Sequence, residues 1–327
     1  MKRILISGGA GYLGTFMTQE FLKKYEVIVY DKFYFPWIKK NFSKIKNNSN
    51  LKFIKKKIAD VEVSDFNKVD IVCDLNGISN DPSSELDCKY TWKINFKDRY
   101  NFAKIAKKAK VKRYIFNSTC SVYGHSKKKV FESSIKRPIS TYAKANLAAE
   151  NAIYKLKNKS FKINILRNST LYGFSNVLRL DLVINIFVYN IIKKKKLSIG
   201  GDGLQFRPFM SLNEVTETYI SLIENKKFPS FICNLVSFNS NVKNIARNIC
   251  KILKVSEDFI TYKGKYSDKR NYIVGSRNFY KYFGKKFKFS KFRNEILNLK
   301  KEIIKSKVKS NNTTIRMKFY KNLFRKI

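Results

Sequence analysis

The chain has 327 residues, and its 68 Lys and Arg against 24 Asp and Glu give a formal net charge of +44. Because the basic residues are spread along the chain, they predict attraction of anionic substrates but no specific nucleic-acid partner. Hydrophobic residues make up 44% of it, enough for a sizeable core, and five cysteines without a C-x-x-C pair exclude a disulfide framework and a thiolate zinc site. No apolar run approaches the roughly 20 residues that span a bilayer, so we expect a soluble, cytoplasmic protein with no integral membrane contact. We also expect no metal site, since the cysteines form no C-x-x-C pair.

A glycine-rich turn follows the first apolar run, Ile4–Ile6, and leads into a helix-like stretch. A strand that ends in such a turn directs backbone N–H groups and the positive end of a helix dipole at one point, where a pyrophosphate can bind. We therefore predict a dinucleotide site here. Its predicted residues are Gly8, Gly11, Tyr12, Leu13 and Gly14.

The second predicted strand, 26–30, ends at Asp31. This position lies about 20 residues beyond the glycines, where a carboxylate can accept both hydroxyls of the adenosine ribose. A carboxylate would repel a 2'-phosphate. The sequence therefore favours NAD over NADP, although Lys32 weakens that preference.

Apolar runs alternate with longer helix-like stretches through the first half of the chain, which is typical of a doubly wound parallel sheet. Long helices are expected over about 90–108 and 140–157. The predicted strands lie near residues 4–7, 26–31, 51–59, 69–75, 112–118 and 162–167.

The pattern becomes irregular after Gly173. Residues 174–305 are expected to form a smaller, mixed lobe with segments that return to the first domain, which covers 1–173. The segment 306–327 is basic and has no acidic residue. We expect a disordered tail there, and the alternative is an amphipathic helix lying weakly on an anionic membrane surface.

These segments together resemble the extended short-chain dehydrogenase/reductase family, in particular its NAD-dependent nucleotide-sugar epimerases and dehydratases. The resemblance rests on the glycine turn, on Tyr142 in the segment Ser140–Lys144, and on later segments up to about residue 285. It implies an α/β fold with a Rossmann-like NAD-binding domain and a substrate-binding lobe. It also implies NAD as cofactor, a nucleotide-sugar substrate and a homodimer.

The resemblance implies further cofactor contacts. Asp60 and Val61 lie where the family places an acidic residue near the adenine. Asn76 lies in the segment after the fourth strand, where small residues pack along the cofactor. Asn76 and Gly77 stand in place of the family's usual pair of alanines.

Thr119 and Tyr142 are the catalytic residues that the resemblance implies. Thr119 would hold the substrate hydroxyl, and the alternative is an ordinary strand-end hydroxyl bonded to backbone. Tyr142 would act as general acid/base on the sugar hydroxyl. Because a free phenol has a pKa near 10, the phenolate needs a stabilising group at neutral pH.

Asn146 departs from the family, which has a lysine four residues after the tyrosine, on the same face of the helix. An amide can hydrogen-bond the nicotinamide ribose but carries no positive charge. Lys144, two residues after Tyr142, is rotated to another face. Three outcomes stay open: a slow enzyme, recruitment of another lysine, or an inactive cofactor-binding relative.

Cys120 and Ser121 follow Thr119 where the 4,6-dehydratases have Asp-Glu. Neither residue acts readily as the acid/base pair that removes water. The sequence therefore favours oxidation with re-reduction, or a single reduction, over dehydration. His125 is the only histidine, and we predict no role and no metal site for it.

Four residues match the family's substrate-binding segments. Guanidinium groups at two of these positions would bind the diphosphate through paired hydrogen bonds. One of the two arginines, Arg270, is the last residue of the segment 268–270. The four residues are Asn168, Asn185, Arg207 and Arg270.

We therefore predict an NAD-dependent nucleotide-sugar epimerase that oxidises a sugar hydroxyl to a ketone transiently and then reduces it again. The alternatives are an NAD(P)-dependent nucleotide-sugar ketoreductase and a catalytically weakened cofactor-binding relative. The sugar, the nucleotide base and the reacting carbon stay open.

Overall fold

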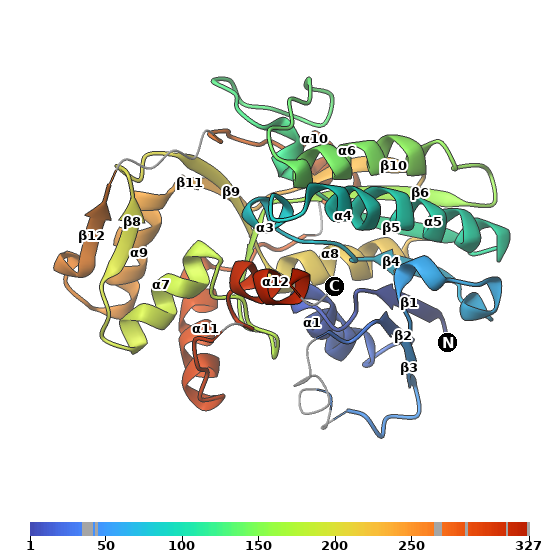
Figure 1. The fold of residues 1–327 in the computed structure, drawn as a ribbon, viewed down its shortest axis with the longest axis horizontal. Coiled ribbons are helices and arrows are strands. Elements are labelled where there is room, and N and C mark those ends of the chain that lie inside the picture. The colour runs from blue at the N-terminus through green and yellow to red at the C-terminus, as the bar shows by residue number, and fades with distance from the viewer. Residues whose placement is uncertain (35–41, 43–44, 265–269, 285–286, 312, 326–327) are drawn as a thin grey trace.

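A parallel sheet forms the centre of the molecule in the computed structural model (Figure 1). The structure describes residues 1–34, 42, 45–264, 270–284, 287–311 and 313–325. In this part of the chain the sheet has seven strands in the order β10-β6-β5-β4-β1-β2-β3. They are β1 (Arg3–Ser7), β2 (Glu26–Asp31), β3 (Leu51–Lys55), β4 (Ile71–Asp74), β5 (Arg113–Thr119), β6 (Lys162–Asn168) and β10 (Phe231–Leu235).

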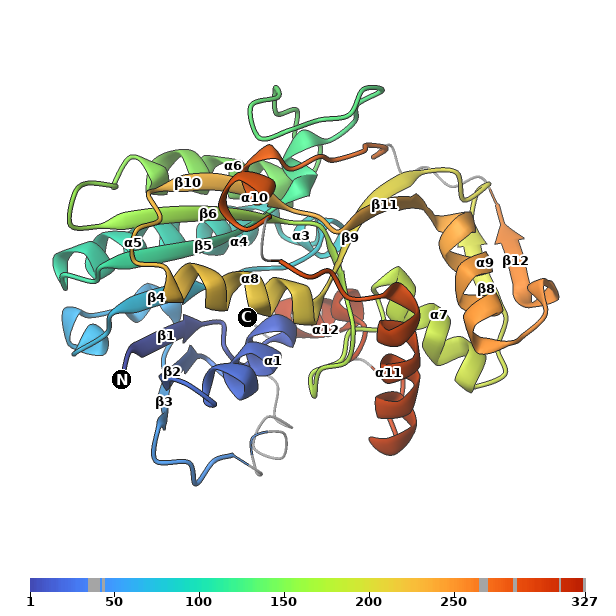
Figure 2. The same ribbon diagram turned by 180° about the vertical axis from the view of Figure 1, so that it is seen from behind.

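Helices cover both faces of the sheet, so side chains that alternate along a strand are buried on either side. Ile4 and Ile6 belong to the core shared with α1 and α8, whereas Leu5 belongs to the core shared with α5 and α6. Figure 1 shows α4, α5 and α6 over one face, and Figure 2 shows α1 and α8 over the other. These helices are α1 (Tyr12–Phe21), α4 (Cys88–Trp92), α5 (Arg99–Lys108), α6 (Thr141–Tyr154) and α8 (Leu212–Glu224).

The doubly wound parallel sheet is the predicted fold, and two of its elements differ in detail from the prediction. The third strand ends at Lys55 and is followed by a short 3-10 turn, Ile58–Asp60. The helix expected over about 90–108 is α4 and α5 joined by a π-helical turn, Lys93–Asp98. This turn places Asn95 against the loop that follows β4.

The second half of the chain forms a mixed lobe and also completes the first sheet, since β10 pairs in parallel with β6. Strands β11, β9 and β7 form another sheet, and β12 pairs with β8. Among the described helices, none is long and apolar enough to cross a membrane. The remaining elements are β7 (Thr170–Tyr172), β8 (Leu197–Gly200), β9 (Phe206–Ser211), β11 (Phe238–Asn241), β12 (Ile260–Lys263), α7 (Val183–Ile192), α9 (Val242–Leu253), α10 (Arg277–Tyr282), α11 (Phe292–Lys305), and the short turns Val63–Phe66, Cys120–Tyr123 and Glu257–Phe259.

The segment expected to be a tail contains the helix α12 (Arg316–Phe324), and the structure differs here from the expectation. This helix packs beside α3 (Asp81–Ser84), between the sheet and the lobe (Figure 1). The ring of Phe324 meets the ring of Tyr90 edge-on, with centroids 5.4 Å apart. This aromatic contact helps to hold the segment against the rest of the protein.

Candidate active site

A cavity of about 710 Å³ lies at the carboxyl ends of the central strands, the usual place for a ligand in a doubly wound sheet. The glycine turn, the end of β2, the start of α6 and the lobe all contribute to its wall. Most of the predicted site residues therefore meet in one place. The predicted residues that line the cavity are Gly8, Gly11, Tyr12, Leu13, Gly14, Asp31, Asn76, Tyr142, Asn168, Arg207 and Arg270.

The glycine turn fits a dinucleotide phosphate. Gly8 has a φ of +69°, and a Cβ there would lie 2.9 Å from the backbone nitrogen of Asn76. A Cβ at Gly14 would lie 2.6 Å from the carbonyl oxygen of Gly8. No side chain caps the N-terminus of α1 at Gly11, so within the described structure the first turn of this helix presents backbone N–H groups to the cavity.

Asp31 is held at the edge of this turn by backbone groups. Its Oδ2 accepts the N–H of Ala10 at 3.1 Å, and its Oδ1 accepts the N–H of Phe33 at 2.7 Å. Burial raises the pKa of Asp31, and these backbone hydrogen bonds oppose that rise. The carboxylate is thus oriented beside the glycine turn, where it fits a ribose.

The loop after β4 forms the next part of the wall. The Asn76 side chain accepts the N–H of Gly77 at 2.9 Å. The Asn95 amide, carried by the π-helical turn, accepts the N–H of Ile78 at 2.8 Å and donates to its carbonyl oxygen at 3.1 Å. Both backbone groups of Ile78 are satisfied by one buried side chain, which fixes the loop along the cavity.

Tyr142 lies in the first turn of α6, at the edge of the cavity. Ser140 caps the helix by accepting the N–H of Ala143 at 3.2 Å, and the Tyr142 N–H donates to Ser84 at 3.0 Å. Burial raises the pKa of Tyr142, and the nearby Thr119 side chain opposes that rise. Thr119 Oγ1 accepts the backbone N–H of Ser121 at 3.1 Å, which is the strand-end arrangement given above as the alternative. Thr119 therefore lies close to Tyr142 but does not line the cavity.

A buried arginine stands next to Asn146, the residue at the position of the family lysine. Asn146 is 1% exposed; its Nδ2 donates to the Tyr142 carbonyl oxygen at 2.8 Å, and its Oδ1 accepts from Arg99 Nη1 at 3.0 Å. The Arg99 charge lowers the pKa of Tyr142. Recruitment of another lysine was one of the open alternatives, and the cation that lies here is instead an arginine from α5.

The charge of Arg99 is balanced inside the protein. Its Nε donates to Asp74 Oδ2 at 2.9 Å, and its guanidinium lies 3.8 Å from the centroid of the Phe116 ring. Asp74 also accepts hydrogen bonds from Ser7 and Tyr114, each at 2.8 Å. A buried ion pair with its lone pairs satisfied is stable enough to keep its geometry. Arg99 was not predicted, because it reaches Asn146 across 47 residues of sequence.

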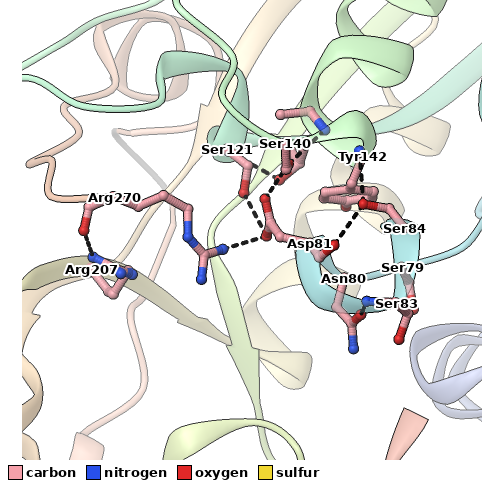
Figure 3. Close-up of polar contacts among 12 residues, drawn as sticks. Ser79, Asn80, Asp81, Ser83, Ser84, Ser121, Ser140, Tyr142, Arg207 and Arg270 are labelled. Atoms are coloured by element: carbon pink, nitrogen blue, oxygen red, sulfur yellow. Dashed lines mark hydrogen bonds and ion pairs between the residues drawn. The ribbon is translucent and has the colours of Figure 1, made fainter. Parts of the chain in front are cut away.

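Asp81 is a second residue that sequence reasoning missed, and Figure 3 shows it at the centre of a cluster of polar side chains. Its carboxylate accepts from Ser140 Oγ at 2.5 Å and from Ser121 Oγ at 3.4 Å, and it forms an ion pair with Arg270. Its negative charge raises the pKa of Tyr142. The segment after β4 was considered only for packing along the cofactor, so a carboxylate at its end carried no separate signal.

The lobe contributes cationic and amide groups. Arg207 Nη1 donates to the carbonyl oxygen of Arg270 at 2.6 Å, so the two predicted arginines lie together in the cavity wall. Residues 268 and 269, which belong to the same predicted segment, lie outside the described residues. Asn168 Nδ2 donates to Asn117, and within the described part of the chain its buried Oδ1 has no hydrogen-bond partner. That oxygen is available to a ligand donor.

Asn185 does not lie in the cavity wall, where substrate contact was expected. Its Oδ1 accepts the Gly173 N–H at 3.1 Å, and its Nδ2 donates to the Tyr12 hydroxyl and the Arg179 carbonyl oxygen, each at 3.0 Å. The side chain is fully buried and its polar atoms are occupied, so it holds Tyr12 in place instead.

Two other predicted residues, Asp60 and Val61, also lie outside the lining. Asp60 is exposed and Val61 is buried at the end of the short turn after β3. Cys120, which stands at a dehydratase acid position, is buried, and its thiol donates to the carbonyl oxygen of Arg167 at 3.2 Å. Burial raises the pKa of this thiol, so it is no acid/base group for a substrate.

The parallel sheet with its strand order, the glycine turn before α1 and the tyrosine that opens α6 define an extended short-chain dehydrogenase/reductase. Within that class, the chain belongs to the NAD dependent epimerase/dehydratase family, whose sequence model matches residues 4–234. Members of this family are enzymes, and NAD is their cofactor.

Known relatives include both epimerases and dehydratases. The chain is 30% identical over 264 residues to dTDP-D-glucose 4,6-dehydratase of Homo sapiens, covering 77% of this chain and 74% of the relative. It is 27% identical over 282 residues to an uncharacterized UDP-glucose epimerase of Bacillus subtilis (strain 168), covering 82% and 85%. The crystal structure of UDP-glucuronic acid 4-epimerase from Bacillus cereus, in complex with UDP-glucuronic acid and NAD, shares the fold, with a TM-score of 0.82, 23% identity and coverage of 93% and 99%.

Proposed function

We propose that the protein is an NAD-dependent nucleotide-sugar epimerase. The observation that carries the proposal is that Tyr142, with Thr119 beside it, lines the same cavity as the glycine turn and the two lobe arginines. Bound NAD would take a hydride from the carbon that bears the sugar hydroxyl and return it to the other face of the ketone. No net cofactor is then consumed.

Tyr142 and Thr119 handle the proton of the sugar hydroxyl. Thr119 can donate and accept at once, so it can hold the hydroxyl while the phenolate of Tyr142 removes the proton. The Tyr142 phenol must lose its proton in a buried place, which raises its pKa. Arg99, held against Asn146, supplies the positive charge that favours the phenolate.

Arg207 and Arg270 would bind the diphosphate of the substrate, whereas Asn168 Oδ1 would accept a hydrogen bond from a hydroxyl or N–H group of the substrate. Guanidinium groups match phosphate oxygens in a planar, two-bonded geometry. Because Arg270 forms an ion pair with Asp81, a diphosphate competes with that carboxylate for the same guanidinium. Substrate binding would therefore release Asp81 next to Tyr142, where it can hydrogen-bond a sugar hydroxyl.

A 4,6-dehydratase is the second candidate, and two observations favour it. A relative that is 30% identical carries this activity in its name. The Asp81 carboxylate lies beside Ser121, two residues after Thr119, so an acidic group is present even though Cys120 is not one. In this reaction Asp81 would supply the acid or base that the Cys120–Ser121 segment lacks.

Product analysis separates the candidates. The purified protein is incubated with UDP-glucose, UDP-glucuronic acid, UDP-N-acetylglucosamine or dTDP-glucose, and the products are identified by mass spectrometry and NMR. An epimerase gives an isomer of unchanged mass, and a dehydratase gives a product lighter by one water. A ketoreductase, which on these alcohols can only run in reverse, gives a product lighter by two hydrogens and reduces added NAD steadily to NADH. Tyr142→Phe is the control and should abolish each reaction. A parent protein as inactive as Tyr142→Phe with every nucleotide sugar would contradict the proposal and leave the cofactor-binding relative.

We also propose a homodimer that pairs α5 and α6 with their copies. The side chains of Trp92, Phe96 and Tyr100 form an aromatic row on α4 and the start of α5, and all three are only half-buried. Such a row favours a partner surface. Light scattering should give twice the monomer mass, and Phe96→Lys should lower it; a monomeric parent would contradict the dimer.

A further inference from the structure

The helix α12 lines the cofactor cavity. The side chains at Arg316, Tyr320 and Leu323 repeat at helical spacing, so they share one face, and that face meets the cavity. Ile315 and Met317 line it as well. The same cavity contains the glycine turn and Asp31, so a segment more than 280 residues downstream in sequence shares the dinucleotide site.

Contacts at both ends hold α12 across this cavity. Before the helix, the Thr314 carbonyl oxygen accepts the backbone N–H of Leu180 at 2.7 Å, which ties the chain to the segment before α7. At the other end Phe324 meets Tyr90 of α4, and the helix packs beside α3. The helix therefore bridges the lobe and the dinucleotide domain.

Arg316 is the buried cation on this helix. It is 3% exposed, and its Nη1 donates to the Thr313 carbonyl oxygen at 3.1 Å. Burial and the neighbouring charge of Arg179 lower the pKa of Arg316 to about 10, which leaves it charged at neutral pH. Asp31 lies close enough to interact with it electrostatically.

Arg316 shares the cavity wall with the glycine turn, since Gly8, Gly11 and Arg316 all line the cavity. Asp31, which accepts the Ala10 N–H of that turn, lines it as well. A second arginine, Arg179, is already paired with Asp181 at 2.6 Å. Arg179 and Arg316 thus place two guanidinium groups, which suit phosphate oxygens, in the cavity wall together with the carboxylates of Asp31 and Asp181.

We infer that α12 closes the dinucleotide cleft and that Arg316 binds the phosphate groups of the dinucleotide, together with the glycine turn. The inference rests on the cofactor site and not on the reaction proposed for the sugar. It follows that the helix must move before the dinucleotide can leave. Slow release suits an enzyme that reuses one bound cofactor.

Charge removal at Arg316 tests this role. The dissociation constant of NAD is measured by calorimetry, without any sugar, for the full-length parent and for Arg316→Gln, Arg316→Lys and Lys318→Gln. Lys318 is exposed on the same helix, so its variant is the matched control for loss of one positive charge. We expect Arg316→Gln to weaken NAD binding roughly tenfold to a hundredfold, in line with the loss of a hydrogen bond between charged groups. Arg316→Lys should keep part of the affinity, and Lys318→Gln should match the parent.

Hydrogen exchange of the full-length parent gives a second readout. We expect NAD to slow exchange in residues 313–324, and stopped-flow release of NADH to be faster in Arg316→Gln. An unchanged or lower dissociation constant of NAD in Arg316→Gln would overturn the inference. Arg316 would then contribute nothing to NAD binding or would oppose it. Unchanged exchange in residues 313–324 would also overturn it. A parent that binds NAD in this way but leaves every nucleotide sugar unchanged would contradict the proposed reaction only.

Discussion

In the proposed reaction Arg99 supplies the positive charge near Tyr142 that the family lysine would otherwise supply. A lysine four residues after the tyrosine would place its charge directly on α6. Here Asn146 occupies that position and holds a guanidinium from α5 at 3.0 Å, while Asp74 keeps that guanidinium in a fixed orientation. The positive charge therefore enters from a neighbouring helix and not from the next turn of the same one.

The pKa of Tyr142 tests this arrangement. In Arg99→Met the phenolate loses its cation and keeps the Asp74 carboxylate nearby, so we expect the pKa of Tyr142 to rise further above its ordinary value. Because the phenolate is the base, the acidic limb of the kcat/KM profile should move to higher pH by the same amount. Ultraviolet titration, taken as the difference from Tyr142→Phe, measures the phenol directly.

Arg99→Lys and the double variant Arg99→Met with Asn146→Lys are the matched controls, since each retains a cation near Tyr142. Both should return the profile towards that of the parent. A single variant Arg99→Met that stays folded with an unshifted profile would show that Arg99 has only a structural role.

The residues of the site divide by how local their signal is. Gly8, Gly14 and Asp31 follow strands at fixed spacing and Tyr142 matches a segment of the family, so the sequence could indicate them, and all four line the cavity. Arg99 and Asp81 act through contacts that cross 47 and 189 residues, and no local pattern marks such a contact. Asn185 was expected to contact the substrate, but its amide is hydrogen-bonded to Gly173, Tyr12 and Arg179 outside the cavity wall. These partners are also distant in sequence, so no local pattern indicated them.

At the scale of elements, the buried ion pair between Arg167 and Glu150 holds α6 against the sheet. Arg167 of β6 donates to Glu150 of α6 at 2.7 Å, and each residue is 1% exposed. Arg167 also donates to the Tyr123 hydroxyl at 2.8 Å, and Ser118 of β5 bonds to Glu150. These contacts set the position of the helix that carries Tyr142.

Arg167→Met should therefore destabilise the protein strongly, because the Glu150 carboxylate would stay buried without its partner. We expect a loss of about 3–5 kcal/mol in the free energy of unfolding. The matched control is Arg247→Met, which breaks the exposed pair with Glu257 at 3.0 Å and should cost at most about 1 kcal/mol. Urea denaturation measures both; equal losses would mean that the buried pair does not fasten α6.

The strands of the sheet were predictable because each is an apolar run between breaks. The sequence indicated that segments of the lobe return to the first domain, but it could not show that β10 adds to the edge of the sheet beside β6, since that pairing joins segments 67 residues apart. The helix α12 was predicted as a tail for a related reason. Its basic composition is typical of a solvated segment, and only the contacts with Tyr90 and the cavity show otherwise.

At the scale of the whole molecule, the net charge of +44 surrounds the cavity with a positive field. Such a field raises the local concentration of anionic ligands and is screened over about 8 Å at physiological ionic strength. We therefore expect the KM for the nucleotide sugar to rise several-fold between about 50 mM and 500 mM NaCl, with kcat nearly unchanged.

Steady-state kinetics across this salt range measures both constants, and the same range of sucrose serves as the nonionic control. A salt effect confined to kcat, or an equal effect of sucrose, would show that the field does not steer the substrate.

The bridge made by α12 also has a consequence for how the protein is made. During translation the strands β1 to β6 and the glycine turn leave the ribosome long before residues 315–323 are synthesised. A nascent chain can thus complete its sheet with β10 while one wall of the coenzyme pocket is still missing. An affinity tag or fusion placed after residue 324 would disturb the packing of α12 against this pocket, whereas a tag at the other end of the chain would not.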